Sequence, residues 1–308
     1  MNNLVLGGAG FIGQHLSHKL LNTRQERVTI VDNLDTAKFN IDDFADHKNL
    51  FEFIHADLNT IDPLDLKRLF RKNHRIFHFA SSVGVEYIDK DPKKTTYNNV
   101  ALMNKIIPLF EDAGKHVVFS STSEIYGNGP TFREDDPSGI GASNKLRWSY
   151  ATSKLMSEFM IRASTFPYTI VRFFNITGPG QLGDYGMVLP RFINAAKNNE
   201  DIIIYGDGNQ VRSFCHINDA ISAVIKVSKI SGELFNIGND VPISMNELAD
   251  TVINLTGSSS KIVHVPYEQA FSKEYEDVKY RVPNLDKLRK SIGYKPEHDL
   301  NRIIRDMI

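Results

Sequence analysis

The chain has 308 residues, of which 41% are hydrophobic and 24% are charged. These values are ordinary for a globular protein and exclude an intrinsically disordered chain. The 36 basic and 37 acidic side chains give a net charge of −1, which argues against binding nucleic acid or an anionic membrane through bulk charge. The length favours one large α/β domain or one such domain with a smaller lobe.

Cysteine usage and hydropathy exclude further classes of protein. Cys215 is the only cysteine, which excludes an intrachain disulfide and a cysteine-based zinc site, and we expect no metal centre. No apolar run approaches the ~20 residues that span a membrane, and a strand pattern that begins at Leu4 leaves no room for a signal peptide. We therefore expect a cytoplasmic protein with no membrane and no nucleic-acid partner.

Apolar runs typical of buried strands alternate with helical stretches over the first half of the chain. The expected strands cover residues 4–6, 28–31, 51–55, 75–79, 116–120 and 168–174. The expected helices cover residues 11–21, 95–113 and 145–164, and another begins at Pro63, a residue favoured in the first turn. This alternation predicts an α/β fold, with a doubly wound parallel sheet and helices on both of its faces.

The pattern changes after Asn175, where glycines become frequent and the expected elements become shorter. The expected elements here are helices over residues 189–197, 219–228, 245–255 and 285–291, and a strand over residues 202–205. We expect residues 1–174, joined again by 211–235, to form the sheet domain. Residues 175–210 and 236–308 are expected to form a smaller α/β lobe that binds the substrate.

The run GGAGFIG at residues 7–13 follows the first expected strand and opens the first expected helix. Glycine permits a tight turn and close approach of the backbone to a pyrophosphate, and the helix N-terminus offers free N–H groups to that anion. Asp32 ends the second strand 19 residues beyond Gly13, close to the ~20 expected for a carboxylate that binds adenosine ribose. An acid there repels a 2′-phosphate, so the pattern predicts a Rossmann-type domain that binds NAD in preference to NADP. The cofactor contacts expected here are Gly7, Gly10, Phe11, Ile12, Gly13, Asp32 and Asn33.

Further cofactor contacts are expected where the later strands end, because ligands of open parallel sheets bind beyond the carboxyl ends of the strands. Asp57 and Leu58 follow the third strand, where the adenine would rest. Ala80 and Ser81 follow the fourth strand, near the nicotinamide. The remaining expected cofactor contacts are Asn99, Ser120, Tyr150 and Lys154.

A candidate catalytic set follows the fifth strand. Tyr150 and Lys154 are four residues apart, which puts them on one face of the expected helix, as in any amphipathic pair. A nearby ammonium and a nicotinamide ring would favour the phenolate and lower the tyrosine pKa from ~10. Tyr150 would then take a proton from a substrate hydroxyl as its carbon gives hydride to NAD⁺, while Thr122 hydrogen-bonds the same hydroxyl.

Together these motifs resemble the extended short-chain dehydrogenase/reductases that act on nucleotide sugars, the NAD-dependent epimerase/dehydratase family. The resemblance covers essentially the whole chain and includes STSEIYG from Ser121, YATSK at 150–154, RFFN at 172–175, YGDG at 205–208, RSF at 212–214 and RVPN at 281–284. It implies a UDP-sugar substrate and a homodimer formed through a four-helix bundle of the helices at 95–113 and 145–164. The substrate contacts it implies are Tyr87, Thr122, Asn175, Val188, Tyr205, Arg212 and Arg281. Among these, the resemblance implies that Asn175 contacts the diphosphate, that Val188 and Tyr205 flank the nucleobase, and that Arg212 and Arg281 neutralise phosphate.

The choice of reaction depends on Ser123 and Glu124. The 4,6-dehydratases of this family carry an Asp-Glu pair here, and serine is a poor general acid, which argues against dehydration. Thr122-Ser123-Glu124 resembles the UDP-glucuronate decarboxylases that form UDP-xylose. The stretch NKxRWxY at 144–150 resembles the one before the catalytic tyrosine in decarboxylases of the lipid A-modifying kind and in apiose/xylose synthases. In such enzymes, oxidation at C4 gives a ketone β to the C6 carboxylate, CO₂ leaves, C5 is protonated, and hydride returns to C4. The resemblance places Tyr87 near that carboxylate.

The expected catalytic residues are Thr122, Glu124, Tyr150, Lys154 and Arg212. Glu124 would take part in proton handling, unless it is a structural acid that caps a nearby loop. A UDP-sugar 4-epimerase would use the same hydroxyl-binding set, and a dehydratase with Glu124 alone is a third enzyme class. A non-catalytic NAD-sensing protein on this fold is disfavoured, because such proteins typically lose the tyrosine or the lysine.

Overall fold

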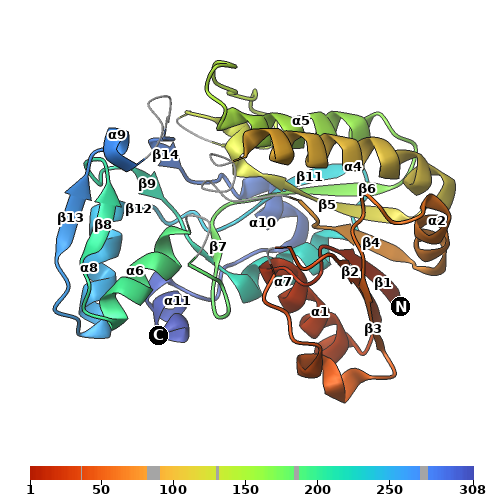
Figure 1. Cartoon of the computed structure of the whole chain (residues 1–308), viewed down its shortest axis with the longest axis horizontal. Helices are drawn as coiled ribbons and strands as arrows, with labels where there is room; N and C mark the ends of the chain where they lie inside the picture. Colours follow the sequence, from red (N-terminus) through yellow and green to blue (C-terminus); the bar gives the residue numbers. More distant parts are fainter. Residues whose placement is uncertain (36, 82–90, 130–131, 184–186, 271–276) are drawn as a thin grey trace.

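The computed structural model describes residues 1–35, 37–81, 91–129, 132–183, 187–270 and 277–308. Within these residues, no helix has both the length and the apolar character needed to cross a membrane. Figure 1 shows two bodies side by side: a large sheet flanked by helices, and a smaller lobe that contains the C-terminus.

A seven-stranded sheet forms the centre of the larger body, and all of its strand pairs are parallel, as predicted. Its strand order is β11-β6-β5-β4-β1-β2-β3, so the order reverses between β1 and β4. Such a reversal opens a crevice at the carboxyl ends of the strands, where ligands bind. The strands are β1 (Asn2–Leu6), β2 (Arg27–Asp32), β3 (Phe51–His55), β4 (Arg75–His78), β5 (His116–Thr122), β6 (Tyr168–Phe173) and β11 (Glu233–Ile237).

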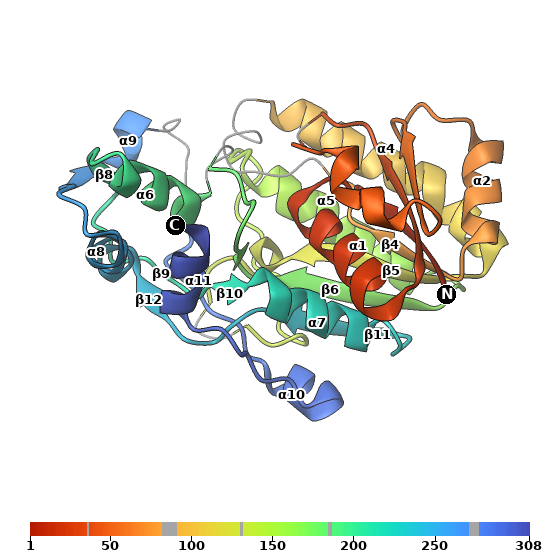
Figure 2. The ribbon, with the colours of Figure 1, turned by 90° about the horizontal axis from the view of Figure 1, so that it is seen from below.

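Helices cover both faces of the sheet because successive side chains of a strand point to opposite faces. Val5 packs in the core beneath α1 (Phe11–Arg24) and α7 (Ile217–Val227). Leu4 and Leu6 pack in the core on the other face, against α2 (Pro63–Lys72), α4 (Pro92–Ala113) and α5 (Trp148–Arg162). In Figure 1 the layer of α4 and α5 lies above the sheet and α1 and α7 lie below it, and Figure 2 views the molecule from the side of α1 and α7. Burial on both faces explains why these strands read as continuous apolar runs.

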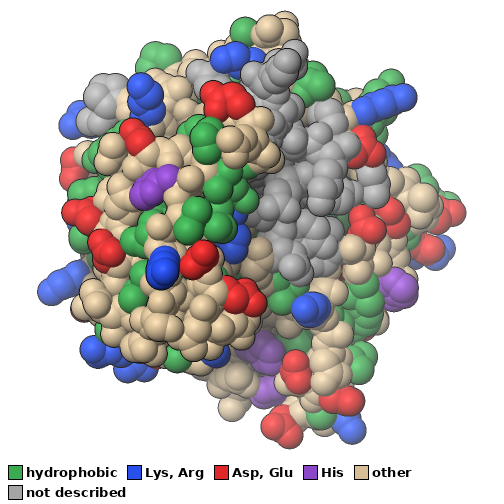
Figure 3. Space-filling view, turned by 60° about the vertical axis from the view of Figure 1, so that its left-hand side comes forward, with side chains coloured by type: hydrophobic (Ala, Val, Ile, Leu, Met, Phe, Trp, Pro, Cys, Tyr) green, Lys and Arg blue, Asp and Glu red, His purple; other side chains and the backbone are tan. Residues whose placement is uncertain are grey.

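The smaller lobe is built from late segments around its own apolar core. Its longer elements are α6 (Val188–Lys197), β8 (Ile202–Tyr205), α8 (Met245–Thr256), β13 (Ile262–Val265), α9 (Tyr267–Ala270) and α11 (Leu300–Met307). A three-stranded sheet, β12-β9-β14, consists of β9 (Val211–Arg212), β12 (Ile243–Ser244) and β14 (Tyr280–Arg281). Figure 3 shows the face on the side of this lobe, on which acidic and basic side chains are interspersed.

The chain crosses between the two bodies more than once. Short strands β7 (Ile176–Thr177) and β10 (Cys215–His216) pair with each other, and α7 and β11 then return to the main sheet. Helix α10 (Asp286–Ile292) also packs there, because Leu285 and Leu288 belong to the core that contains Val5. The domain boundaries stay a prediction. They assign α10 to the smaller lobe, whereas Leu285 and Leu288 pack in the core of the larger body.

Several element boundaries differ from the expected ones. The helix expected over residues 145–164 begins only at Trp148, because the preceding residues form turns. The strand expected to end at Phe79 ends at His78. Strand β13 and helix α11 were not expected from the sequence. They are short, and long-range contacts stabilise them: β13 pairs with β8, and Ile303 and Ile304 of α11 enter the core of the lobe.

A buried ion pair joins α5 to the sheet. The Arg172 guanidinium of β6 binds the Glu158 carboxylate of α5 through two bonds, Nε to Oε1 at 2.9 Å and Nη2 to Oε2 at 2.7 Å. Ser121 of β5 donates a hydrogen bond to the same carboxylate at 2.5 Å. Both charged side chains are almost fully buried. Helix α5 is therefore held against the carboxyl ends of β5 and β6.

Candidate active site

A cavity of about 730 Å³ lies at the carboxyl ends of the strands and is lined by both bodies of the molecule. It brings together residues from the N-terminal glycine turn to Arg281 near the C-terminus. Every cofactor, substrate and catalytic residue predicted from the sequence lines this cavity, apart from Tyr87. Tyr87 lies outside the described residues. The predicted set is thus one site in space, although the role of each member stays a prediction.

The glycine turn between β1 and α1 depends on the absence of side chains. Gly7 has a φ of +76°, and a Cβ there would lie 2.4 Å from the backbone nitrogen of Ala80. A Cβ on Gly13 would lie 2.6 Å from the Cα of Gly8. Gly10 differs, because a Cβ there would meet only the Gly7 oxygen, at 3.4 Å. Gly7 and Gly13 are needed for the turn itself, whereas a side chain at Gly10 would occupy space that a ligand needs.

The N-terminus of α1 is prepared for an anion. Its N-cap residue, Gly10, provides no side-chain cap, and no acidic residue lies in the first turn. Free N–H groups and the positive end of the helix dipole therefore face the cavity. Next to the turn, the Asp32 carboxylate accepts hydrogen bonds from the backbone N–H groups of Ala9 at 3.0 Å and Leu34 at 2.8 Å. Burial raises the pKa of Asp32, and these donors partly oppose that rise.

Lys154 and Tyr150 lie together on α5, both buried. The Lys154 ammonium donates a hydrogen bond to the backbone oxygen of Ser120 at 2.8 Å. Burial lowers the pKa of Lys154 to about 7, although the Glu158 carboxylate opposes the decrease. Burial also raises the pKa of Tyr150, and the Glu124 carboxylate adds to the increase. Hydrogen bonds of this phenol with the Thr122 and Ser81 hydroxyls act in the opposite direction and lower the pKa.

A second set of contacts fixes the side of the cavity that follows β4. Ser81 Oγ donates to Asn99 Oδ1 at 3.2 Å, and Asn99 Nδ2 donates to Ser153 Oγ at 3.3 Å. Ser153 in turn donates to the backbone oxygen of Tyr150. This chain of hydrogen bonds connects α4 to the helix that carries Tyr150. Ser81 also hydrogen-bonds the Tyr150 phenol, on the side where the sequence predicts the nicotinamide end of the cofactor.

Glu124 is clamped between two arginines. Arg147 Nη2 lies 2.6 Å from Glu124 Oε2, and Arg281 Nη1 hydrogen-bonds Glu124 Oε1. Burial alone would raise the pKa of Glu124, but the guanidinium groups of Arg281, Arg147 and Arg212 lower it to about 2. The Glu124 backbone N–H also binds Thr122 Oγ1 at 3.2 Å. Glu124 is therefore an anion at neutral pH, and in this arrangement it has no proton to donate.

The far end of the cavity holds the residues predicted to bind the nucleotide. Tyr205 ends β8, and the Arg191 guanidinium lies over its ring, 4.5 Å from the centroid. Asn175 takes a φ of +36° and donates its side-chain amide to the backbone oxygen of Ser213 at 2.9 Å. Val188 begins α6 beside them. Aromatic, cationic and amide groups thus line the end of the cavity that faces the smaller lobe.

Several cavity residues were not predicted from the sequence. Among them are Arg147, Arg191, Gln210, Tyr267 and Asp277. Arg147 lies in the NKxRWxY stretch, so its motif was visible but its contact with Glu124 was not. The other four carry no local motif. They reach the cavity through the folding of α6, α9 and the segments beside β9 and β14, which are distant in sequence.

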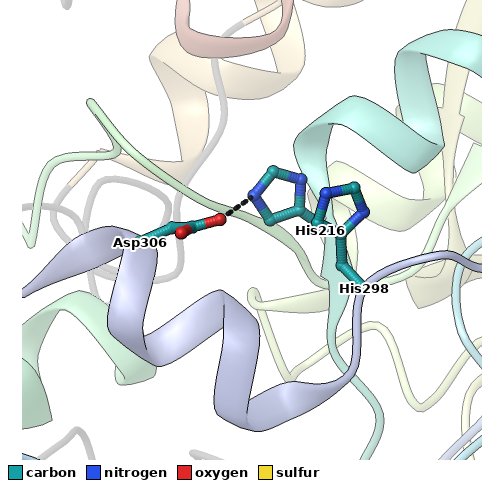
Figure 4. A group of neighbouring side chains, drawn as sticks. All are labelled: His216, His298 and Asp306. Carbon is teal, nitrogen blue, oxygen red and sulfur yellow. Dashed lines mark ion pairs between the residues drawn. The ribbon is translucent and has the colours of Figure 1, made fainter.

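A separate cluster of His216, His298 and Asp306 has the residue types of a metal site (Figure 4). His216 Nδ1 accepts the backbone N–H of Asn218 at 3.0 Å, so the neutral ring carries its proton on Nε2, which faces Asp306 at 3.5 Å. The two imidazoles stack with centroids 4.1 Å apart, so their in-plane lone pairs run side by side and do not converge on one point. The cluster is a junction between β10 and α11, and its geometry does not suit a shared metal ion.

The three glycines should respond differently to alanine. We expect Gly10→Ala to fold with a melting temperature near that of the wild type and to bind NAD at least tenfold more weakly, because only ligand space is lost. We expect Gly7→Ala and Gly13→Ala to destabilise the protein by about 2 kcal/mol or more, because the added Cβ meets backbone. Thermal melts and titration with NAD measure the two effects. Equal losses of stability in all three variants would contradict this division.

Residues 3–238 match the model of the "NAD dependent epimerase/dehydratase family". The chain is 37% identical to a UDP-N-acetyl-alpha-D-glucosaminuronate decarboxylase of Bacillus cytotoxicus, over 99% of this chain and 96% of that protein. It is 31% identical to UDP-glucuronic acid decarboxylase 3 of Arabidopsis thaliana, over 96% of this chain and 85% of that protein.

A solved structure matches the fold of the chain over almost its whole length. A UDP-glucose 4-epimerase of Thermotoga maritima, determined with UDP-glucose, superposes with a TM-score of 0.84 at 26% identity, over 99% of this chain and 96% of that one. The sequence match spans most of the chain, and the structural match extends over both bodies of the molecule. The chain therefore belongs to the NAD-dependent epimerase/dehydratase family.

Proposed function

We propose that this protein is an NAD-dependent decarboxylase that converts UDP-glucuronate to UDP-xylose. The observation that carries the proposal is the arginine group around Glu124, next to Tyr150 and Lys154 in one cavity. The guanidinium groups of Arg147 and Arg281 pair with the Glu124 carboxylate, and that of Arg212 pairs with Asp277, which gathers three cationic groups at one end of the cavity. A nucleotide-linked uronic acid brings a diphosphate and a carboxylate, and guanidinium groups match both.

NAD is the cofactor that the other half of the cavity fits. The glycine turn and the α1 N-terminus offer backbone N–H groups to a pyrophosphate. The Asp32 carboxylate has two backbone donors and keeps lone pairs for ribose hydroxyls. A 2′-phosphate would meet this carboxylate as a like charge, which favours NAD over NADP. When bound, NAD supplies the acceptor and later the donor of the hydride.

The first chemical step is oxidation at C4, and the residues on α5 and β5 serve it. Tyr150 as phenolate takes the proton of the C4 hydroxyl, while Thr122 hydrogen-bonds that hydroxyl. The Lys154 ammonium stabilises the phenolate, which burial would otherwise make costly. The resulting ketone is β to the C6 carboxylate, so the bond to CO₂ breaks with its electrons delocalised into an enolate. C5 is then protonated and C4 is reduced.

Dehydration is a poorer fit because the described residues of the cavity do not supply the acid that it requires. Loss of the C6 hydroxyl as water needs a proton donor near C6. Ser123 stands at the position where the dehydratases carry an aspartate, and the pKa of about 2 keeps Glu124 ionised. Decarboxylation needs no proton at C6, since CO₂ leaves without one. A 4-epimerase is the second candidate, because the Thermotoga maritima relative is a UDP-glucose 4-epimerase on the same fold.

Exposed apolar side chains on α4 and α5 form a surface on which two copies of the chain could pack. Tyr97 of α4 and Met156 and Phe159 of α5 are large apolar side chains that are more than half exposed, on two helices that lie side by side. We propose that these helices pack against those of a second copy in a four-helix bundle, as the family resemblance implies.

The single cysteine is buried and forms no disulfide, which fits a reducing compartment. We therefore propose a cytoplasmic location.

The decisive experiment is a product assay. Purified protein is incubated with UDP-glucuronate and NAD⁺, and the products are identified by mass spectrometry and proton NMR. We expect a product lighter by one CO₂ with a xylose spin system, and no product from Tyr150→Phe. Unchanged mass with a galacturonate spectrum would instead establish the 4-epimerase. UDP-N-acetylglucosaminuronate is the parallel substrate, because the Bacillus cytotoxicus relative is a decarboxylase of that sugar.

Glu124→Gln should change the pH dependence of oxidation. The substitution removes the negative charge that raises the pKa of Tyr150 and leaves Arg147 and Arg281 without this partner, and both changes favour the phenolate. Because C4 oxidation requires the phenolate, we expect the acid limb of the rate of NADH formation to move to lower pH. Stopped-flow absorbance measures that rate. Glu233→Gln, which alters a surface pair with Lys287 outside the cavity, is the control and should leave the limb in place.

The dimer proposal predicts the effect of charges on the α4–α5 face. Combining Phe159→Glu with Tyr97→Glu places two acidic groups on each copy where side chains 62% and 69% exposed now lie. Multi-angle light scattering should then report a monomer. Leu64→Glu on α2, at a side chain that is 62% exposed, is the matched control and should remain dimeric. A wild-type protein that is monomeric at all concentrations would refute the proposal.

A further inference from the structure

We propose that Asp277 is a positioning residue that, together with Tyr267, holds Arg212 in the orientation that binds the diphosphate of the nucleotide sugar. The inference rests on the proposed function, since it assumes that a nucleotide diphosphate occupies the end of the cavity near the smaller lobe. It adds two residues that carry no sequence motif.

The guanidinium of Arg212 is fixed on two of its edges. Nη2 binds Asp277 Oδ1 at 3.0 Å, and Nη1 donates to the backbone oxygen of Val211 at 2.9 Å. The Arg212 side chain is 8% exposed and that of Asp277 is 17% exposed, so the pair is shielded from solvent. An exposed arginine loses much side-chain entropy when it binds an anion, whereas one already held in place loses little. The ion pair therefore prepares Arg212 for its ligand.

Asp277 is itself held from two other directions. Its Oδ1 accepts the backbone N–H of Val278 at 2.9 Å, and its Oδ2 accepts the phenol of Tyr267 at 2.9 Å. With Arg212 as a further donor, both carboxylate oxygens are engaged inside the protein. A carboxylate bound in this way orients its partners, and it is poorly suited to bind an anionic ligand directly.

The chain of hydrogen bonds continues to the residue predicted to flank the base. Gln210 Nε2 donates to the Tyr267 oxygen at 3.2 Å and to the backbone oxygen of Tyr205 at 2.9 Å. The Tyr267 ring also packs against Gly206, where an added Cβ would lie 2.5 Å from Cε2. Tyr205 and Arg212 are therefore connected through side chains of three different segments. This connection fixes the position of the base-binding group relative to the phosphate-binding group.

The strand pairing places this assembly next to the reacting end. Strand β9 pairs with β14 in parallel, and Arg212 is the register partner of Arg281. Arg281 binds Glu124, and Arg212 adds to the charges that lower the pKa of Glu124. The two neighbouring arginines therefore have different carboxylate partners. Asp277 holds Arg212 on the nucleotide side of the cavity, while Glu124 holds Arg281 on the sugar side.

The test compares UDP affinity with turnover. Asp277→Asn keeps the shape of the side chain but loses the charge that holds Arg212. We expect the Kd for UDP and the KM for the UDP-sugar to rise about tenfold, with kcat within about twofold of the wild-type value. Tyr267→Phe should raise both constants by about threefold, because Asp277 keeps its charge and loses one of its hydrogen bonds. Asp240→Asn, which alters the surface Asp240–Arg289 pair, is the matched control and should change neither constant.

A double-mutant cycle separates positioning from direct contact with the ligand. If Asp277 acts through Arg212, Arg212→Ala combined with Asp277→Asn binds UDP no more weakly than Arg212→Ala alone. Additive losses would overturn the proposal, because they show that Asp277 contacts the ligand itself. Wild-type UDP affinity in both Asp277→Asn and Tyr267→Phe would also overturn it. A wild-type protein that binds no UDP would fail the proposed function first, so the two failures are distinguishable by calorimetry.

Discussion

The buried ion pair between Glu158 and Arg172 fixes the geometry on which the site depends. Helix α5 carries Tyr150 and Lys154, and its orientation relative to β5 decides whether they meet Thr122. The pair joins this helix to β6, and Ser121 joins the same carboxylate to β5. A buried charge left without its partner costs about 3–5 kcal/mol, so the fold strongly disfavours arrangements in which α5 moves away. The reacting groups are thus placed by a contact one helical turn beyond them.

The charges on the cavity wall divide it into two halves. At the sheet side, three carboxylates, those of Asp32, Asp35 and Asp57, outnumber the Lys38 ammonium around the position expected for adenosine. Backbone N–H groups at the glycine turn serve the pyrophosphate. On the side of the smaller lobe, the cationic groups are Arg147, Arg191, Arg212 and Arg281. A ligand with hydroxyls at one end and anionic groups at the other fits this order. Lys154 and Tyr150 lie where the halves meet, and hydride transfer between cofactor and sugar belongs at that boundary.

The sequence was informative where function depends on local backbone geometry. The glycine turn is readable because Gly7 and Gly13 tolerate no Cβ, and the pairing of Tyr150 with Lys154 follows from helix geometry. The parallel sheet followed from apolar runs that alternate with helices. The contact of Arg281 with Glu124 joins residues 157 positions apart, and Asp277 reaches Arg212 across 65. Such contacts arise only when the smaller lobe folds over the sheet, so no local pattern announces them.

The charge balance around Glu124 also separates a uronic acid from a neutral hexose. Glu124 is ionised, and two guanidinium groups already share its charge. Arg212 and Asp277 form a further pair beside them, on the side proposed to bind the diphosphate. Every UDP-sugar carries that diphosphate, so the nucleotide side of the cavity does not distinguish one sugar from another. On the sugar side, a C6 carboxylate competes with Glu124 for the guanidinium groups of Arg147 and Arg281, an interaction that a neutral hexose cannot make. Loss of CO₂ ends this competition and leaves both arginines to Glu124 before the product is released.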